Sequence, residues 1–420
     1  MDFVFPVQAH FTCLQCGDCC RGWEIALSEA EVERIEALGW DGVDAGPMGE
    51  PILRSTVSGR AWSVLARKPD GSCVFLTTEN LCALHKHFGE DSKPLMCRLY
   101  PFSFHEVSSR VAVDVAFSCR AVAADHGAPL ATQQPEWTRL VEEGGVGLLS
   151  TGLAKGVRLH GELLWEIEHH IIRLLEDDTR TLVRRLWSIQ QFVRLALVGD
   201  PSTKAASQLR RAIASSVPSQ LDAREPPGEL DRTERAVVYQ WFYLLMNPVP
   251  IGFLKLNPRA RRELLKKRDR QSEVAIQQDD AFVDGESLGV SADDVRNVAV
   301  GVLQHATTEA ALSRYLGALI LGQRFVQADS ETLDLREAIP RWLLIYPSIL
   351  FASRALAVSR GIAEVEAEDV RRAVRLIDRG AGRVSLSKLH GPRRKAWTFV
   401  LQETDAAIAA AVELERSHAQ

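Results

Sequence analysis

Cysteines are the side chains of this 420-residue chain whose type and spacing point most directly to chemistry. Four of them crowd into the segment FTCLQCGDCCRGW, as Cys13, Cys16, Cys19 and Cys20. Thiolate sulfur is the soft ligand that selects zinc, copper(I) or iron-sulfur clusters, and two-residue gaps let successive sulfurs converge on one centre. We therefore expect this segment to bind metal.

The remaining cysteines also lie early in the chain, before residue 120, at Cys73, Cys82, Cys97 and Cys119. The last 301 residues contain none. Buried thiols can act simply as small hydrophobes, but chance would not leave so long a stretch without cysteine. All eight are therefore predicted to be metal ligands.

The spacing leaves the number of centres and the metal open. Eight thiols can form two sites of four thiolates, or one cluster with further free or neighbouring thiols. Cys20 is adjacent to Cys19, and adjacent side chains usually diverge, so Cys20 is expected at a second centre, at a bridging position or beside the ligands. Zinc and iron-sulfur clusters both accept this spacing. His85, His87 and His105 could replace a thiolate, but they are expected to be ordinary histidines.

The elements around the cysteines are short and mixed. The segment ALSEAEVERIEALGW predicts a helix that Ser28 caps, with Glu31 at the reciprocal capping position. The segment AWSVLARKPDGSCVFLT predicts two strands around a turn, and RVAVDVAFSC predicts a half-buried strand whose Asp114 faces solvent. We expect residues 1–125 to form a small, loop-rich cysteine-cluster domain, in which bound metal contributes folding free energy that a thin core cannot supply.

Residues 126–420 are predicted to form an α-helical domain, so the fold class is mainly α. Apolar residues recur at three- and four-residue steps in GELLWEIEHHIIRLLEDD and TLVRRLWSIQQFVRLAL. Similar stretches follow near 233–246, 258–276, 292–325, 336–359 and 366–379. Proline and glycine interrupt them, which indicates a bundle or an irregular stack of helices.

The amino-acid composition limits the kinds of binding partner that we expect. Hydrophobic residues make up 46% and charged residues 25%, as in globular proteins, and the net charge of −5 gives no reason to expect nucleic acid. The basic segment 259–270 is interpreted as a solvated helix. The first ten residues do not resemble a secretory signal. The longest apolar stretch is interrupted by Pro347 and Arg354 and is judged too short for a membrane span, so we expect a cytoplasmic protein with reduced thiols.

Four segments together resemble a known family: CLQCGDCCRGW, CVFL, LCALH and KPLMCRLYPF. They are similar to the cysteine-cluster family with the CxxCxxCC motif, described as zinc- or iron-chelating. The two-part layout resembles its flagellin lysine-N-methylase branch. The resemblance covers about residues 11–120, and over the helical part it is much looser.

This resemblance implies an S-adenosylmethionine-dependent protein-lysine N-methyltransferase with an iron-sulfur cluster bound by some of the eight cysteines. It favours iron-sulfur over zinc. The implied partner is a protein that presents lysine side chains, with flagellin as one candidate. The rival hypothesis is a non-enzymatic zinc- or iron-binding module whose helices bind a partner. Arg98 and Tyr100 flank Cys97 and could contact the cofactor, although a structural role in the ligand loop is favoured. No catalytic base is identified.

Overall fold

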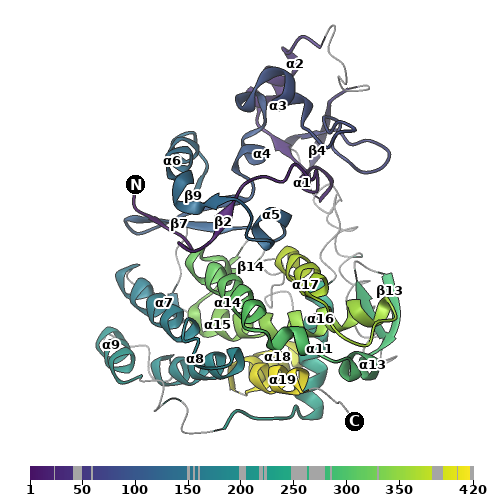
Figure 1. The fold of residues 1–420 in the computed structure, drawn as a ribbon. Coiled ribbons are helices and arrows are strands. Elements are labelled where there is room, and N and C mark those ends of the chain that lie inside the picture. Colours follow the sequence, from purple (N-terminus) through teal and green to yellow (C-terminus); the bar gives the residue numbers. More distant parts are fainter. Residues whose placement is uncertain are drawn as a thin grey trace.

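The computed structural model describes all residues except 23, 41–49, 58–59, 149–151, 155–156, 159–160, 198–204, 217–220, 222–224, 247–262, 264–279, 284–285, 329–330, 381–390, 404 and 417–420. Small sheets and loops come first in the chain, and a mostly helical part follows (Figure 1). The mainly α fold class predicted from the sequence is confirmed. The basic segment 259–270 and the helix expected near 258–276 lie outside the described residues, apart from Glu263.

The central N-terminal sheet is built around strand β7, Arg110–Val115. It has the order β1-β7-β6-β9, in which β6, Phe102–Val107, runs antiparallel to β7. The outer strands β1, Phe3–Val4, and β9, Val146–Leu148, pair in parallel with their neighbours. Every residue of β7 after Arg110 is buried, so the expectation of a half-buried strand was wrong. The reason is that helix α14, Ala306–Leu321, packs against β7, which gives the strand a second covered face.

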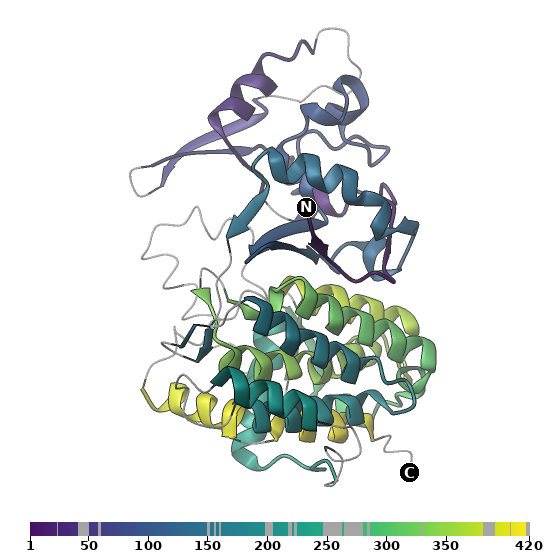
Figure 2. The same cartoon turned by 90° about the vertical axis from the view of Figure 1, so that its left-hand side faces the viewer.

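A smaller lobe with its own core lies beyond this sheet, at the top of Figures 1 and 2. Its elements are β3 (Ala26–Leu27), α2 (Glu29–Glu36), β4 (Ile52–Val57), β5 (Arg60–Leu65), α3 (Ala83–Phe88) and α4 (Leu95–Leu99). The predicted capping box is confirmed, because the Glu31 amide donates to Ser28 Oγ and the Ser28 amide donates to Glu31. The buried core of the lobe includes Ile35, Phe75 and Leu84, and it is much smaller than the other core.

The first cysteine segment is anchored where strand β2, His10–Phe11, pairs with β8, Ala128–Pro129. The Thr12 amide donates to the carbonyl of His126 at 2.7 Å. Gly127 directly precedes β8 and has a φ of +105°. A Cβ at this position would overlap both the side chain and the backbone of Thr12. This turn therefore requires glycine.

Replacing Gly127 with alanine is expected to lower the free energy of unfolding by roughly 1–3 kcal/mol, because it adds a left-handed strain and a clash beside Cys13. Urea denaturation measures the change. The matched control is Gly71→Ala, at a φ of +79° with open space around the added carbon, which should cost less. Equal losses in the two variants would show that the contact with Thr12 is unimportant.

The helical part stacks beneath the central sheet, as Figure 2 shows. Its remaining long helices are α7 (Gly161–Leu175), α8 (Leu182–Leu197), α9 (Ala205–Ser215), α11 (Arg232–Met246), α15 (Leu335–Leu343), α16 (Ile345–Ser359), α17 (Ala367–Gly380), α18 (Gly391–Glu403) and α19 (Ala406–Glu415). Short strand pairs interrupt the helices, namely β10 (Gly152–Ala154) with β11 (Val157–Arg158), β12 (Asp280–Val283) with β13 (Glu286–Ser291), and β14 (Gln327–Ala328) with β15 (Glu331–Thr332). The periodic segments of the sequence correspond to α7, α8, α11, α14, α15, α16 and α17.

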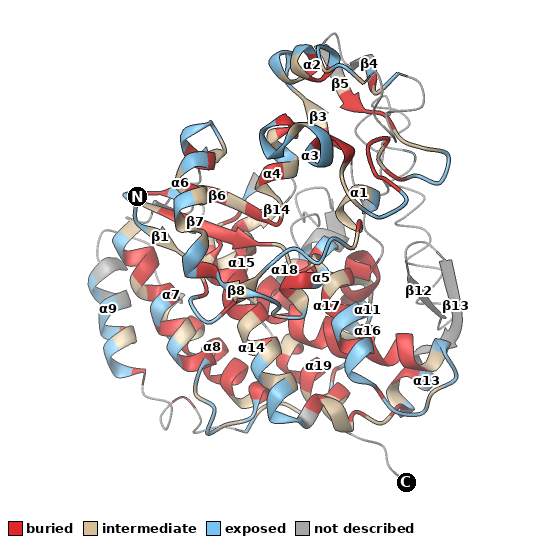
Figure 3. Ribbon diagram, turned by 45° about the horizontal axis from the view of Figure 1, so that its top comes forward, coloured by how far each residue is buried: buried red, intermediate tan, exposed pale blue. Residues whose placement is uncertain are grey.

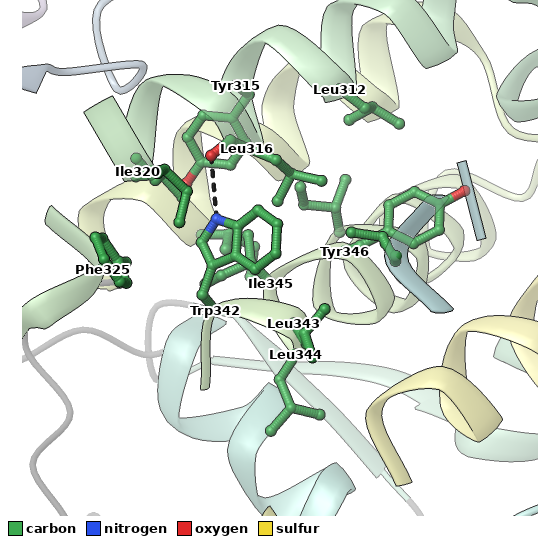
Figure 4. Packing of buried hydrophobic residues seen from close by; sticks show 14 of the residues in the cluster. Leu312, Tyr315, Leu316, Ile320, Phe325, Trp342, Leu343, Leu344, Ile345 and Tyr346 are labelled. Atoms are coloured by element: carbon green, nitrogen blue, oxygen red, sulfur yellow. Dashed lines mark hydrogen bonds between the residues drawn. The ribbon is translucent and has the colours of Figure 1, made fainter. Parts of the chain in front are cut away.

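One large core joins the central sheet to the helices, and buried residues concentrate there in Figure 3. Trp342 of α15 lies in this core, where its indole N–H donates to the carbonyl of Leu316 at 3.0 Å (Figure 4). Phe117, which follows β7, contacts the ring of Tyr315 in α14 with centroids 4.8 Å apart. The sheet that carries Cys119 is therefore packed directly on helices.

Helices α15 and α16 correct one expectation about length. Among the described residues, Leu335–Ser359 is long and apolar enough to cross a membrane by length and composition, with a mean hydropathy of 1.4 in its most apolar window. The judgement that this stretch is too short was therefore wrong. However, 89% of its most apolar window is buried within the protein, and Arg354 inside it donates to the carbonyls of Arg296 and Arg416. The stretch forms part of the core.

Candidate metal centre

All eight cysteines line one cavity of about 490 Å3. The cavity lies between the two cores: Phe75 and Leu84 of the small lobe line it, as do Phe102 and Trp137 of the large core. None of the eight described cysteines forms a disulfide. Residues up to 106 positions apart in the sequence are thus brought to one place, which is the arrangement that shared metal binding requires.

The first four cysteines lie on a tightly curled loop. Gln15 and Gly17 adopt left-handed conformations, with φ of 51° and 71°, and the Gln15 amide donates to Cys13 Sγ at 3.4 Å. The loop then enters the short helix α1, Cys19–Gly22. A side chain at position 17 would meet Arg21 and Asn80, which hydrogen-bond each other at 3.0 Å. The conformation of the loop is therefore fixed by contacts on both sides.

Asp18, inside the cysteine motif, is held by two arginines. Its Oδ2 accepts from Arg120 Nε at 2.7 Å and from Arg375 Nη2 at 2.6 Å. Arg120 begins helix α5, Arg120–Ala123, directly after Cys119, whereas Arg375 belongs to α17 of the helical part. The loop of the first four cysteines is thus tied both to the segment of Cys119 and to a helix 357 residues away.

Three further cysteines come from the small lobe. The Cys73 amide donates to the carbonyl of Cys20 at 2.8 Å, and Cys82 forms a β-bridge with Leu76. Cys82 precedes α3, and Cys97 lies within α4. These cysteines pack against the lobe's core.

Cys119 comes from the other side of the cavity, at the start of α5, and packs against the large core. The preceding residue, Ser118, is held by the helical part. Its amide donates to Asp378 Oδ2 at 2.7 Å, and its carbonyl accepts from Arg375 Nε at 3.4 Å. Both partners of Ser118 lie on α17, so one helix holds the segment of Cys119 as well as the loop that contains Asp18.

The protonation of the thiols differs across the cavity. A hydrogen bond between Cys19 and Cys20 lowers the pKa of Cys19 to about 7, with help from Lys93, and raises the pKa of Cys20. Burial raises the pKa of Cys97 and raises that of Cys119 to about 11. A bound cation lowers these raised pKa values, because coordination requires and stabilises the thiolate.

The separation of the thiols bears on the kind of metal. Among the described residues, no three His, Cys, Asp or Glu side chains lie close enough together to hold one ion. Zinc bonds to sulfur at about 2.3 Å, so four thiolates around one zinc stand only about 3.8 Å apart. In an iron-sulfur cluster each thiolate binds a different iron, which allows wider spacing. The donor set itself suits zinc and iron alike, since thiolate sulfur binds both.

Arg98 and Tyr100, the candidate cofactor contacts, both line the cavity. The Arg98 guanidinium pairs with Glu143 and, at 3.4 Å, with Asp91, so its charge is balanced by carboxylates. Its Nε is buried without a hydrogen-bond partner. Burial raises the pKa of Tyr100, and the neighbouring Cys119 thiolate adds to this effect.

The three histidines lie in different surroundings. His85 is exposed but lines the cavity, and His87 is exposed. His105 lies on β6, where its Nε2 contacts the Gln327 side chain at 3.0 Å, and burial lowers its pKa to about 4. Of the three, only His85 lies at the cavity, so whether any histidine replaces a thiolate stays a prediction.

Sequence analysis did not identify two residues that hold the cysteine segments in place. Asp18 stands in the middle of the cysteine motif, and that position was a signal that could have identified it. Arg375 carries no such signal, because only the fold brings it to Asp18. Asp114 was expected to face solvent, but it is only 7% exposed. It receives a hydrogen bond from Ser103 Oγ at 3.2 Å and lies 3.5 Å from Arg324.

Comparison with known proteins identifies the cysteine-bearing segment. Residues 12–120 match the family model CxxCxxCC, described as "Putative zinc- or iron-chelating domain". The chain is similar to a lysine-N-methylase of Salmonella choleraesuis, at 24% identity over 116 residues, which are 27% of this chain and 29% of that protein.

Two other relatives match over a similar length. The flagellar biosynthetic protein FliU of Salmonella muenchen is 24% identical over 116 residues, which are 27% of this chain and 69% of that protein. An uncharacterized protein of Methanocaldococcus jannaschii is 30% identical over 95 residues, which are 22% of this chain and 29% of that protein. The match therefore spans less than a third of the lysine-N-methylase. No solved structure gives a significant match.

Proposed function

We propose that the cysteines of residues 12–120, which match the CxxCxxCC family model, bind an iron-sulfur cluster and that the protein methylates lysine side chains of a protein substrate. The shared cavity of the eight cysteines carries the metal-binding part of the proposal. The name of the Salmonella lysine-N-methylase suggests the reaction, and that of FliU suggests a flagellar protein as substrate. A cytoplasmic location with reduced thiols is part of the same proposal.

The proposed reaction is a methyl transfer from S-adenosylmethionine. The lone pair of a neutral lysine Nζ forms the new C–N bond while the bond from the methyl carbon to the sulfonium sulfur breaks. S-adenosylhomocysteine leaves, and the methylated ammonium loses a proton to solvent. When bound, the cluster supplies a Lewis-acidic, redox-active iron centre in the cavity.

The cavity favours the neutral form of a substrate lysine amine, because its walls remove water from the amine. An unperturbed lysine has a pKa of about 10.4, and transfer to apolar surroundings lowers it. Aromatic side chains supply such surroundings, from Phe11, Phe75, Phe102 and Trp137. The carboxylates on the described wall are each paired with a cation: Asp18 with Arg120 and Arg375, Glu90 with Lys93, and Glu136 with Arg139. Pairing makes them poor bases, which favours desolvation over general-base catalysis.

Arg98 is the residue we assign to S-adenosylmethionine. Its buried Nε, which has no acceptor among the described residues, offers a donor to the methionine carboxylate. Tyr100, close to Cys119, can donate a hydrogen bond to a sulfur of the cluster.

A second candidate function follows from the part of the chain that the family model does not cover. The family model ends at residue 120, so it gives no indication of what the helices do. In this alternative, zinc or iron has a structural, storage or sensing role, and the helical part binds a partner.

Anaerobic purification with metal and sulfide analysis separates the two candidates. The methyltransferase proposal expects brown protein with stoichiometric acid-labile sulfide. Colourless protein with tightly held zinc would favour the binding module.

Calorimetric titration of the cluster-replete protein with S-adenosylmethionine tests the activity further, together with mass spectrometry of a flagellin substrate for lysine mono- to trimethylation. Arg98→Gln should weaken cofactor binding, whereas Arg54→Gln, at an exposed ion pair of the same lobe, should not. Cluster-replete protein that binds no S-adenosylmethionine would overturn the methylase proposal.

A further inference from the structure

Helix α17 carries an arginine-rich face next to the cavity. Its acidic first turn is followed by Arg371, Arg372, Arg375 and Arg379, and the one later carboxylate, Asp378, is fully buried. Positions 371, 372 and 375 lie within about 100° of the helix circumference, because each residue turns an α-helix by about 100°. Arg371 and Arg372 are exposed, and Arg375 is partly exposed. This side of α17 therefore presents positive charge to solvent.

The arginine-rich face continues to the wall of the cavity through Asp18. Asp18 Oδ2 accepts from Arg375 Nη2 at 2.6 Å and from Arg120 Nε at 2.7 Å. Asp18 and Arg120 both line the cavity, and α5, which begins with Arg120, contacts α17 (Figure 1). We call the arginines of this surface the basic rim: Arg120, Arg371, Arg372 and Arg375.

The basic rim carries more positive charge than its carboxylates neutralise. Asp18 serves two of the four arginines, and Glu368 pairs with Arg371 at 2.9 Å. Among the described residues, no carboxylate pairs with Arg372. Four guanidiniums therefore face two carboxylates, which leaves an excess of two positive charges, although the whole chain has a net charge of −5. A local excess of this kind attracts a negatively charged partner.

The rim also bears on the lysine that the proposed reaction requires. A lysine ammonium that approaches the cavity is repelled by the guanidiniums, and the same like charge lowers the pKa of the lysine, which favours the neutral amine. Carboxylates beside the lysine in the substrate would bind the rim and offset the repulsion. Arginine suits this task, because its planar guanidinium can donate two parallel hydrogen bonds to one carboxylate.

We propose that the basic rim binds an acidic segment of a protein partner, and that the protein therefore acts on lysines that have carboxylates close by. The proposal rests on the proposed function for the lysine, but on the rim alone for the acidic partner. Nucleic acid is another polyanion that arginines bind, but the negative charge of the whole chain disfavours it. A protein segment also agrees with the protein substrate of the proposed reaction.

The test measures the binding of labelled synthetic peptides to the full-length chain by fluorescence anisotropy. Each peptide has one central lysine, which is flanked by Asp and Glu in one peptide and by Asn and Gln in the other. The acidic peptide is expected to bind about tenfold more tightly at low salt, and this difference should shrink as salt screens the charges. Arg372→Glu, at an exposed side chain, should weaken binding of the acidic peptide about fivefold and leave the uncharged peptide unaffected.

The matched control is Arg211→Glu, which makes the same change in charge at an exposed residue of α9, on the opposite side of the helical part (Figure 1). It should bind the acidic peptide as the wild type does. Equal affinities for the two peptides, or an equal loss in both variants, would overturn the proposal.

Two further results are distinguishable from these. A single-stranded DNA oligonucleotide that displaces the acidic peptide at lower concentration than the unlabelled peptide does would assign the rim to nucleic acid, and would also overturn the proposal. Methylation of the peptides is a separate measurement by mass spectrometry. Rim-dependent binding of the acidic peptide without methylation would contradict the proposed function and leave the acidic partner of the rim supported.

Discussion

Replacing Asp378 with alanine is expected to lower the free energy of unfolding by about 3–5 kcal/mol, because it removes one of the two carboxylates beside the largely buried Arg324 and the acceptor of the Ser118 amide. Asp378 is fully buried in α17, and its Oδ1 lies 3.4 Å from Arg324 Nη1. Burial raises the pKa of Asp378, although Arg324 opposes this. The pair therefore contributes little net stability as it stands, but removal of one partner is costly. Urea denaturation measures the loss.

The substitution should also destabilise the cavity, since Asp378 Oδ2 accepts a hydrogen bond from the amide of Ser118, next to Cys119. We expect Asp378→Ala to release metal faster to a chelator than the wild type does. The matched control is Glu368→Ala on the same helix, where an exposed pair with Arg371 is worth about 1 kcal/mol or less. Similar destabilisation by both variants would contradict a special role for the buried pair.

Sequence patterns predicted the elements whose signal is local. The capping box of α2 and the apolar periods of α7 and α8 depend on residues within one helix, and these elements are confirmed. The β7 strand was identified but its burial was underestimated, because α14 covers its second face from about 200 residues further along the chain. Of the two strands expected in segment 61–77, the first is β5, whereas after the turn at residues 69–71 only isolated bridges form, between Arg67 and Cys73 and between Leu76 and Cys82.

In the candidate site, too, local features were predictable and long-range contacts were not. Residue type and clustering were enough to select the eight cysteines, and the fold brings all of them to one cavity. Their individual roles as ligands remain a prediction, as does the domain division at residue 125. Long-range partners left no trace in the sequence: Arg375 reaches Asp18, and Arg324 lies 3.5 Å from Asp114. Such contacts depend on how α17 and α14 pack, which no local pattern specifies.

These long-range contacts give the helical part a role at the metal site. Arg375 and Asp378 lie one helical turn apart on α17, so both side chains point to the same side. One binds the carboxylate within the cysteine motif, and the other binds the backbone beside Cys119. A shift of α17 would therefore move both the loop of the first four cysteines and the segment of Cys119. A protein partner that binds the helices could alter the cavity through this helix.

Removing the metal is expected to unfold the small lobe while the helices stay folded, which is the largest effect we predict. The lobe's buried core includes few large side chains, such as Ile35, Phe75 and Leu84, whereas the large core extends over most of the helices. A core this small contributes too little hydrophobic burial to offset the entropy of its loops. Thiolate–metal bonds would supply the missing free energy, which for structural zinc reaches about 10–16 kcal/mol.

Amide hydrogen exchange before and after anaerobic treatment with a chelator measures this directly. We expect the amides of α2, α3 and β5 to lose protection by several orders of magnitude, because their opening free energy falls toward zero. The amides of α14 and α16 act as an internal control within the same chain and should change little. Cys97→Ser should produce the same pattern without a chelator, since Cys97 connects α4 to the lobe's core. Unchanged protection in α2 and α3 after complete metal loss would mean that the lobe's fold does not depend on metal, and that the eight thiols are not there to hold it together.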